Sequence, residues 1–264
     1  GTVSGSGDVG GVVGHNNSSG NGNTAIVKNC YNTGTVSAVA QIADDGRGNV
    51  GGVVGVIESD SVNDCYNTGT VTGSEDGSNA GGGVGVVGTD RGSEYKSTVS
   101  NCYNTGDVTG SGGSSNVGGV VGSIVVGNYE VTNCYYLDTC GAGGSGTSKT
   151  ASEFASGDVA WLLQDGQDDP VWGQQNLGAE NSLPMLTSEE SYSVIQVTFK
   201  ESEEDTQPYV AYTNYNGTVT FPENPTPPEG QVFDGWYSGD AKYDSTTKFT
   251  EDTTLTAKFA EAPT

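Results

Sequence analysis

The amino-acid sequence predicts a mainly β protein, in which a parallel β-solenoid (β-helix) of about four three-sided coils and a short helical cap precede a small β-sheet module. Three observations predict this class. A phrase built around Cys-Tyr returns after 35, 37 and 32 residues, and a phrase rich in valine and glycine lies between its copies. Repeats of this length are typical of solenoids. The composition also changes along the chain, because 39 of 43 glycines precede residue 180 whereas all eight prolines lie at or after Pro170.

The repeat consists of these two phrases. Asn-Cys-Tyr-Asn-Thr-Gly or a variant of it places its cysteine at Cys30, Cys65, Cys102 and Cys134. Val-Gly-Gly-Val-Val-Gly starts at residues 9, 50 and 117, and the copy at residues 80–85 reads Ala-Gly-Gly-Gly-Val-Gly, where the extra glycine predicts a bulge. The first five residues match the segment after the second cysteine phrase. We therefore expect the chain to begin partway through a repeat of a longer protein.

Each repeat contains three short β-prone stretches separated by Gly, Asn, Ser and Asp, which predicts three strands per coil. In such coils each strand pairs in parallel with its equivalent about 4.8 Å away, so identical positions form columns. We expect valines to fill a narrow core and glycine pairs to allow tight corners. A polar column is expected just before each Val-Gly-Gly phrase. Its members are Asp8, Asn49, Asn79 and Asn116.

Cys and Tyr are adjacent on the predicted strand, so one of them points inward and the other outward. Free cysteine is among the most buried residue types, which favours an inward structural column of cysteines over a metal site. Its members are Cys30, Cys65, Cys102 and Cys134. In-register neighbours are poorly oriented for disulfides, so Cys134 and Cys140 are the pair that we would expect to be bonded, if any is.

The tyrosines then form an outward aromatic column, which is the candidate ligand-binding site. Its members are Tyr31, Tyr66, Tyr103 and Tyr135. Aromatic side chains stack on sugar rings and anchor protein partners. The structural alternative, a packing column covered by a neighbouring loop, is favoured because stacked aromatic residues stabilise solenoids without any ligand.

Acidic clusters lie in the loops between the predicted strands, and calcium is the metal to consider for them. The candidate ligands are Asp44, Asp45, Glu75 and Asp76. Their spacing matches neither an EF-hand loop nor the calcium-binding nonapeptide of β-helices, so solvated loops are the favoured interpretation and we expect no cofactor. A zinc-type site is also disfavoured, because His15 is the only histidine.

The charge of the chain excludes two classes of partner. With 33 Asp and Glu against 9 Lys and Arg, the formal charge is -24. Such a surface repels nucleic acid and anionic membranes. No apolar run approaches the roughly 18 residues of a transmembrane helix, and we expect a monomer.

The end of the solenoid is expected to be capped by residues 149–187, since an open parallel edge invites aggregation. A capping box at residues 150–153 predicts a helix over residues 150–164, broken at Gly157. We expect Trp161 and Trp172 to plug the end of the solenoid. The apolar segments at residues 170–174 and 183–186 are expected to place a last strand against the final coil.

Residues 188–193 are expected to form a linker to a module at residues 194–264. Apolar and polar residues alternate over 195–199 and 254–259, which predicts two half-buried strands. About 70 residues suffice for a small independent core.

Residues 1 to about 140 resemble the GLUG repeats of bacterial cell-surface proteins, on the strength of the four paired phrases described above. Valine stands where the family has leucine. The resemblance implies an extracellular protein on the cell surface or secreted. Such repeats also occur beside peptidase domains in some secreted immunoglobulin A proteases, which keeps an accessory role in a larger secreted hydrolase or peptidase open.

Residues 194–260 resemble the Listeria-Bacteroides repeat of bacterial surface proteins. The resemblance rests on the order Val-Thr-Phe, Asn-Gly-Thr-Val, a proline-rich turn, Phe-Asp-Gly-Trp-Tyr at residues 233–237 and Thr-Leu-Thr-Ala-Lys-Phe, with Phe259 in place of the usual tryptophan. It implies a small β-grasp-like fold that serves as a spacer or interaction module.

The expected function is therefore non-enzymatic: adhesion to a surface protein or glycan of a host or neighbouring cell, or a spacer role. A carbohydrate-active β-helix enzyme is the weaker alternative. Lyases need grouped cations, whereas Lys28, Arg47, Arg91 and Lys96 are scattered. The abundant carboxylates leave a glycosidase open, but a single histidine offers little for triad chemistry.

Overall fold

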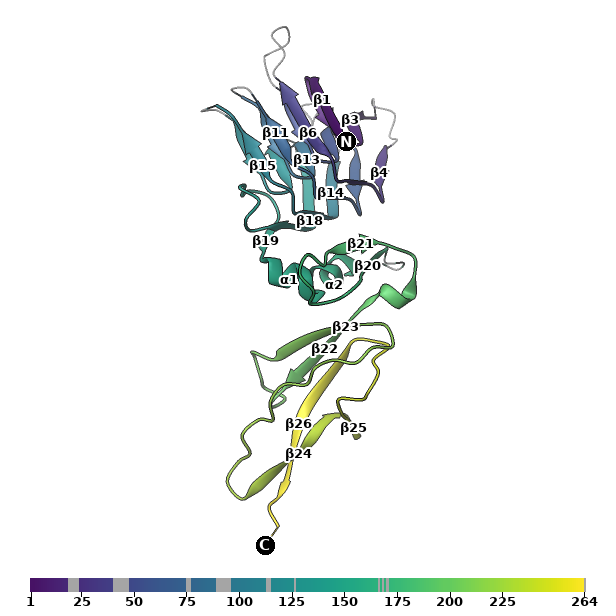
Figure 1. The fold of residues 1–264 in the computed structure, drawn as a ribbon, viewed down its shortest axis with the longest axis vertical. Helices are drawn as coiled ribbons and strands as arrows, with labels where there is room; N and C mark the ends of the chain where they lie inside the picture. The colour runs from purple at the N-terminus through teal and green to yellow at the C-terminus, as the bar shows by residue number, and fades with distance from the viewer. Residues whose placement is uncertain are drawn as a thin grey trace. The chain divides into compact units, whose positions relative to one another are not determined.

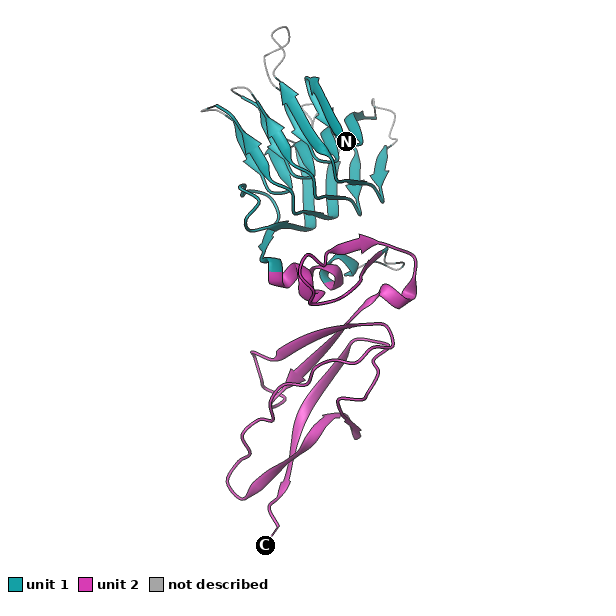
Figure 2. Cartoon of the chain, viewed as in Figure 1, with its two compact units in different colours: residues 1–151, 162–171 teal, residues 152–161, 172–264 magenta. Residues whose placement is uncertain are grey.

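The computed structural model describes residues 1–18, 24–39, 48–74, 77–88, 96–112, 115–125, 127–165, 167, 169 and 171–263. They form two compact units, which Figure 2 distinguishes by colour. Unit 1 comprises residues 1–151 and 162–171, and unit 2 comprises residues 152–161 and 172–264.

Unit 1 is built from four parallel sheets, in which each strand pairs with its equivalent in the next copy of the repeat (Figure 1). Sheet A contains β1 (Thr2–Ser6), β6 (Thr35–Val39), β11 (Val71–Gly73) and β15 (Val108–Gly110). Sheet B contains β2 (Asp8–Gly10), β7 (Asn49–Gly51), β12 (Asn79–Gly81) and β16 (Asn116–Gly118). Sheet C contains β3 (Val13–Asn17), β8 (Val54–Glu58), β13 (Val84–Val87) and β17 (Val121–Ile124). Sheet D contains β4 (Ile26–Lys28), β5 (Tyr31–Asn32), β9 (Ser61–Asn63), β10 (Tyr66–Asn67), β14 (Lys96–Asn104), β18 (Asn128–Leu137) and β19 (Thr147–Lys149).

The strands of unit 1 pair in the register of the sequence repeat. Val71 lies between Val36 and Val108 in sheet A, and Cys102 pairs with Cys134 in sheet D. Equivalent residues therefore form columns in a β-helix-like stack. The predicted parallel pairing is confirmed.

The prediction of three sides per coil is wrong, because the Val-Gly-Gly-Val-Val phrase forms two strands with a corner between them. A side chain on Gly51 would place its Cβ 1.8 Å from the carbonyl oxygen of Val54. Only glycine permits so sharp a turn. β7 and β8 consequently belong to sheets B and C, and each coil has four sides.

Unit 1 has two apolar cores rather than one narrow core. The core between sheets C and D contains Val27, Val53, Val54, Ile57, Val62, Cys65, Val84, Val87, Val99, Cys102, Val120, Val121 and Cys134. The core between sheets A and B contains Val9, Val36, Ala38, Val50, Val71, Ala80 and Val108. Between them the buried amide of Asn67 lies against the backbone of Gly52, where an added Cβ would be 2.4 Å from Asn67 Cγ. We call this Asn and Gly contact the waist of the coil.

The predicted bulge at Gly83 is absent from the register. Val84 still pairs with Val54 and with Val121. The backbone N–H of Gly83 donates to the carbonyl of Val120 at 2.8 Å, as expected of an unbroken column. Gly83 therefore occupies a valine position of the repeat without a side chain.

The last full coil of unit 1 is covered by the segment that follows β18. The N–H of Val108 donates to the carbonyl of Cys140 at 2.8 Å, and that of Gly119 donates to Gly143 at 2.6 Å. β19 then pairs in parallel with β18. Residues 140–149 thus act as a partial coil on the end of the sheets.

Two short helices follow, α1 (Ala151–Ser156) and α2 (Asp158–Gln164). Gly157 separates them with a φ of 104°, a conformation that favours glycine. The predicted helix and its break are confirmed.

The segments after the helices do not add a strand to the final coil. β20 (Trp172–Gln174) and β21 (Pro184–Leu186) pair with each other in an antiparallel sheet of unit 2. Both tryptophans belong to unit 2. Trp172 is buried, and the indole N–H of Trp161 donates to Asp252 at 2.8 Å. The prediction that they plug the end of the solenoid stays a prediction. The predicted limits of a separate cap and of a linker stay predictions.

Unit 2 also contains a mixed sheet with the strand order β23-β22-β26-β24-β25, preceded by the 3₁₀ helix η1 (Glu190–Tyr192). Its strands are β22 (Val194–Lys200), β23 (Tyr209–Asn214), β24 (Gln231–Ser238), β25 (Ala241–Tyr243) and β26 (Thr253–Glu261). The first and last strands pair in parallel at the centre, and the other pairs are antiparallel. Its core contains Ile195, Val197, Phe199, Val219, Trp236, Phe249, Leu255 and Ala257. The two predicted strands of this module are confirmed.

Substitution by alanine should change the free energy of unfolding in different directions at the adjacent residues Gly82 and Gly83. In Gly82→Ala the new Cβ would lie 2.2 Å from the carbonyl of Gly119 and 2.3 Å from Asn104 Cγ. We expect a loss of more than about 2 kcal/mol of unfolding free energy, because backbone cannot move aside cheaply. In Gly83→Ala the Cβ meets Val120 at 3.4 Å, an ordinary contact. That variant should be neutral or about 0.4–1 kcal/mol more stable, because alanine restricts the unfolded chain.

Denaturant unfolding of both variants beside the parent chain measures the difference. Equal losses in the two variants would contradict the assignment of the waist to Gly82 and of a valine position to Gly83.

Candidate functional site

The cysteine phrase begins at a corner of the coil whose first residue has a left-handed backbone. The φ angles are 55° at Asn29, 52° at Asp64, 51° at Asn101 and 47° at Asn133. Asn and Asp tolerate this conformation better than other residues with side chains. In the first two coils the corner separates β4 from β5 and β9 from β10, whereas β14 and β18 run through it.

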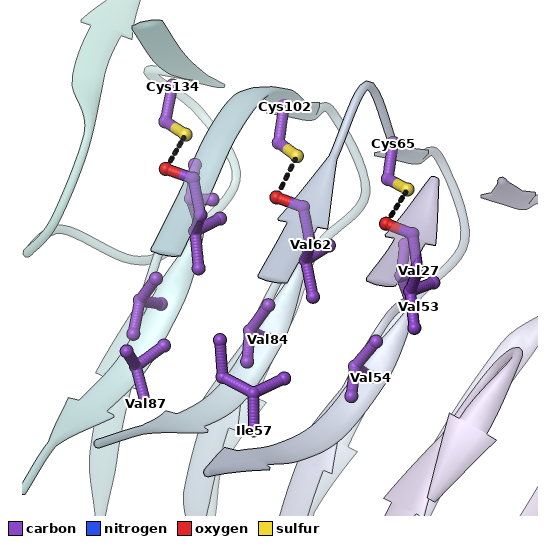
Figure 3. Packing of buried hydrophobic residues seen from close by; sticks show 13 residues of the cluster. Val27, Val53, Val54, Ile57, Val62, Cys65, Val84, Val87, Cys102 and Cys134 are labelled. Atoms are coloured by element: carbon purple, nitrogen blue, oxygen red, sulfur yellow. Dashed lines mark hydrogen bonds between the residues drawn. The ribbon is translucent and has the colours of Figure 1, made fainter. Parts of the chain in front are cut away.

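The cysteines form the inward column that was predicted. Cys65, Cys102 and Cys134 are buried in the core and Cys30 is half-buried. Each Sγ lies 3.1–3.2 Å from the carbonyl oxygen two residues earlier. In three of them a valine carbonyl of the preceding coil, from Val27, Val62 or Val99, lies at 3.5–3.8 Å (Figure 3). The column is a row of small core residues whose weak S–H donors meet backbone oxygens.

All five thiols are free, so the disulfide considered between Cys134 and Cys140 does not form. Cys140 instead lies buried in the partial coil, with its Sγ 3.9 Å from the carbonyl of Ala142. Burial raises the pKa of Cys102 well above its ordinary value and also raises the pKa of Cys30. Both shifts suppress the thiolate.

The tyrosines stack as a column but do not form a uniformly exposed one. The rings of Tyr31 and Tyr66, and of Tyr66 and Tyr103, lie 5.0 Å apart and nearly parallel. Exposure falls along the column, from 57% at Tyr31 to 1% at Tyr103 and 7% at Tyr135. Burial accordingly raises the pKa of Tyr66 and, more strongly, that of Tyr103. The prediction of an outward surface is wrong for Tyr103 and Tyr135, and only the end at Tyr31 and Tyr66 is accessible.

An asparagine column follows two residues after the cysteines and was not predicted. Asn67 donates to Asn104 Oδ1 at 2.8 Å and to the carbonyl of Gly69 at 2.7 Å. It accepts from Asn32 Nδ2 at 2.7 Å and from the Gly69 N–H at 3.2 Å. Both donors and both acceptor positions of this fully buried amide are therefore satisfied. The signal in the sequence was an Asn at a fixed distance after three of the four cysteines.

The second amide column, predicted before each Val-Gly-Gly phrase, is confirmed. Asn116 donates to Asn79, Asn79 to Asn49 and Asn49 to Asp8, each at 2.7 Å. Asp8 ends the column because its carboxylate has no N–H group to donate. Its second oxygen lies 2.9 Å from His15 Nδ1.

A polar pocket of about 340 Å³ opens on the outer side of sheet D. It is lined by Lys28, Asn63, Asp64, Ser100, Asn101, Gln167 and Asp169. The buried carboxylate of Asp64 lies 3.5 Å from Lys28 Nζ and accepts from Gln167 Nε2 at 2.9 Å. Ser100 donates to the amide of Asn63 rather than to a base. The pocket offers donors and acceptors for a hydroxylated ligand, but no pair of nucleophile and base.

The predicted calcium ligands Asp44, Asp45, Glu75 and Asp76 lie outside the described residues. Within the described ranges, no three His, Cys, Asp or Glu side chains are grouped to hold a metal ion. The described part of the chain also contains no helix with the length and hydropathy needed to cross a bilayer.

The comparisons with known proteins bear on unit 2. Residues 196–258 match the family model of the Listeria-Bacteroides repeat domain. The match begins in β22 and ends in β26, so it covers the mixed sheet. The chain is similar to that family over this segment, and such domains are typical of surface proteins. No curated protein and no solved structure matches the chain at a significant level.

Replacing the central amide of the waist by a carboxylate should destabilise unit 1 strongly. Asn67→Asp keeps the shape but removes both donors, which leaves the Gly69 carbonyl and Asn104 Oδ1 facing an acceptor. At roughly 1–3 kcal/mol per unsatisfied buried group, we expect a loss of about 2–6 kcal/mol at pH 7. Burial raises the pKa of the introduced acid above its unfolded value, so the loss should shrink as the pH falls from 7 toward 4.

Asn181→Asp, on an exposed turn of unit 2, makes the same change of charge and serves as the control. Urea unfolding of both variants at pH 7 and pH 5 measures the effect. Equal stabilities of the two variants would contradict a buried, fully bonded amide at Asn67.

Thiol labelling should distinguish one cysteine from the other four. Cys30 is the only half-buried one, so a small alkylating reagent should modify it alone in the folded protein. Because burial raises the pKa of Cys30, its rate should keep rising above pH 9. Mass spectrometry after a short exposure counts the labels. Four further labels should appear only in denaturant, and rapid native labelling of Cys102 or Cys134 would refute the inward column.

Proposed function

We propose that this chain is a non-enzymatic segment of a bacterial cell-surface or secreted protein that acts in adhesion, with a spacer role if it binds no ligand. In this proposal unit 1 is a GLUG-type β-solenoid and the mixed sheet of unit 2 is a β-grasp-like module. The observation that carries the proposal is the match of residues 196–258 to a domain typical of surface proteins, on the same chain as a stack of repeats.

The construction of unit 1 supports a presenting role. Its four sheets and two amide columns tie each coil to the next through hydrogen bonds in register. A stack of this kind holds its surface rigidly, and rigid surfaces lose less entropy on binding. The accessible surface next to the repeat includes the exposed ring of Tyr31 and the polar pocket at Lys28 and Asp64. An aromatic ring and neutral or charged hydrogen-bonding groups are the elements that bind glycans and protein loops.

The same pocket supports a role without catalysis. Ser100 is bonded to an amide, and Asp64 is already engaged by Lys28 and Gln167. Catalytic sites need mutually supporting groups around a reacting atom. The alternative, an accessory domain of a secreted hydrolase or peptidase, rests on the resemblance of the repeats alone, and sequence flanking this segment decides between the two.

A binding screen tests the proposal. The chain, immobilised through its C-terminal end, is exposed to arrays of extracellular-matrix proteins and surface glycans. We expect saturable binding of at least one class, reduced about tenfold by Tyr31→Ala, which corresponds to 1.4 kcal/mol. Tyr129→Ala removes another exposed tyrosine of unit 1 outside the column and should leave binding unchanged. Uniformly negative arrays with folded protein would rule out adhesion, and glycan turnover would refute the absence of catalysis.

A further inference from the structure

A second cavity lies wholly within the mixed sheet module of unit 2. It has a volume of about 310 Å³ and is partly open to solvent. It is lined by Phe199, Glu201, Asp205, Gln207, Tyr209, Pro222, Glu223 and Trp236. These residues come from the hairpin of β22 and β23, from the proline-rich loop and from β24. Figure 1 shows β22, β23 and β24 in one sheet.

The floor of the cavity is aromatic and rigid. Phe199 and Trp236 are 1% and 4% exposed, and their rings meet edge to face at 5.1 Å. Tyr209 adds a third ring 5.9 Å from Phe199 and is 48% exposed. The exposed ring of Tyr209 is therefore the aromatic face that a cation can approach, and such faces attract cations through their quadrupole.

The rim of the cavity is acidic. Three of its eight lining residues are carboxylates, Glu201, Asp205 and Glu223, and none is a lysine or arginine. Asp205 accepts the N–H groups of Glu201 and Gln207, which lowers its pKa and fixes the hairpin turn. Within the described residues, Glu201 and Glu223 form no ion pair. The rim therefore has two carboxylates available to a cationic ligand.

The indole of Trp236 provides a probe of the cavity. Trp236 lines the cavity, and its Nε1–H is buried and has no acceptor among the described residues. A guanidinium group has donors only, so it cannot pair with this N–H. The resonance of the N–H therefore reports binding nearby without being part of the proposed contact.

We propose that this cavity binds an arginine side chain of a partner protein. Guanidinium is planar, stacks on aromatic rings and bonds two carboxylates at once, whereas ammonium is a compact and strongly hydrated charge. The surrounding module favours such a partner electrostatically, because residues 194–264 contain twelve Asp and Glu and only four Lys. The proposal goes beyond adhesion by unit 1 and is independent of it.

Nuclear magnetic resonance of the full ¹⁵N-labelled chain tests the proposal, with acetyl-Gly-Arg-Gly-amide as the probe. The Nε1–H signal of Trp236 should shift saturably at millimolar peptide. The same peptide with citrulline, which lacks the charge, should shift it at least tenfold more weakly, and the lysine peptide should also bind more weakly. Absence of a saturable shift, or equal binding of the citrulline peptide, would overturn the arginine site.

Two double variants distinguish binding in the cavity from general electrostatic attraction of the peptide to the acidic module. Glu201→Gln with Glu223→Gln removes both available rim carboxylates and should weaken the arginine peptide at least tenfold. Glu203→Gln with Glu229→Gln removes two exposed charges from the same turn and loop but not from the lining, and should weaken it less than twofold. Equal weakening in both would show that net charge alone attracts the peptide. This outcome concerns unit 2 only, so it leaves the test of adhesion by unit 1 unaffected.

Discussion

The contact between stacked asparagine amides and glycine backbone at the waist is the constraint on which unit 1 depends. It holds sheet D and the corner between sheets B and C at a distance that no Cβ could allow, as the 2.4 Å from a side chain on Gly52 to Asn67 Cγ shows. The waist divides the cross-section into two apolar cores. Because the amide of Asn67 is fully satisfied by Asn32 and Asn104 in the two adjacent coils and by Gly69 in its own, a slip of register would break several buried hydrogen bonds at once.

The same constraint explains how the repeat is varied and how it stops. Gly83 replaces a valine without changing the register, since Val84 still pairs with Val54 and Val121. The neighbouring Gly82 keeps its close contact with the amide of Asn104. In the fourth copy Tyr136 stands opposite Asn104, and its ring fills the space against Gly119 where the next amide would lie. The amide column ends there, and the partial coil at residues 140–149 covers the sheets.

The sequence predicted the period, the parallel pairing, the inward cysteines, the polar column at Asp8 and the helix break at Gly157, because each follows from a repeated residue type with one strong local preference. It did not predict the fourth side, because the Val-Gly-Gly-Val-Val pattern is compatible with one strand as well as with two. The close approach of Gly51 to the carbonyl of Val54, which makes the corner, is visible only in the structure. The pairing of Trp161 with Asp252 joins residues far apart in the chain, and neither it nor the burial of Tyr103 follows from a local sequence pattern. The cavity beside Trp236 was missed for the same reason: its walls come from three separated stretches.

Hydrogen exchange of the side-chain amide of Asn67 shows whether the asparagine amides form a buried, hydrogen-bonded column. The Asn67 Nδ2 protons should exchange only through unfolding of unit 1, many orders of magnitude more slowly than those of the exposed Asn181. Exchange of the Asn67 amide at the rate of Asn181 would show that the waist is open to water, and the four-sided coil described above would not stand.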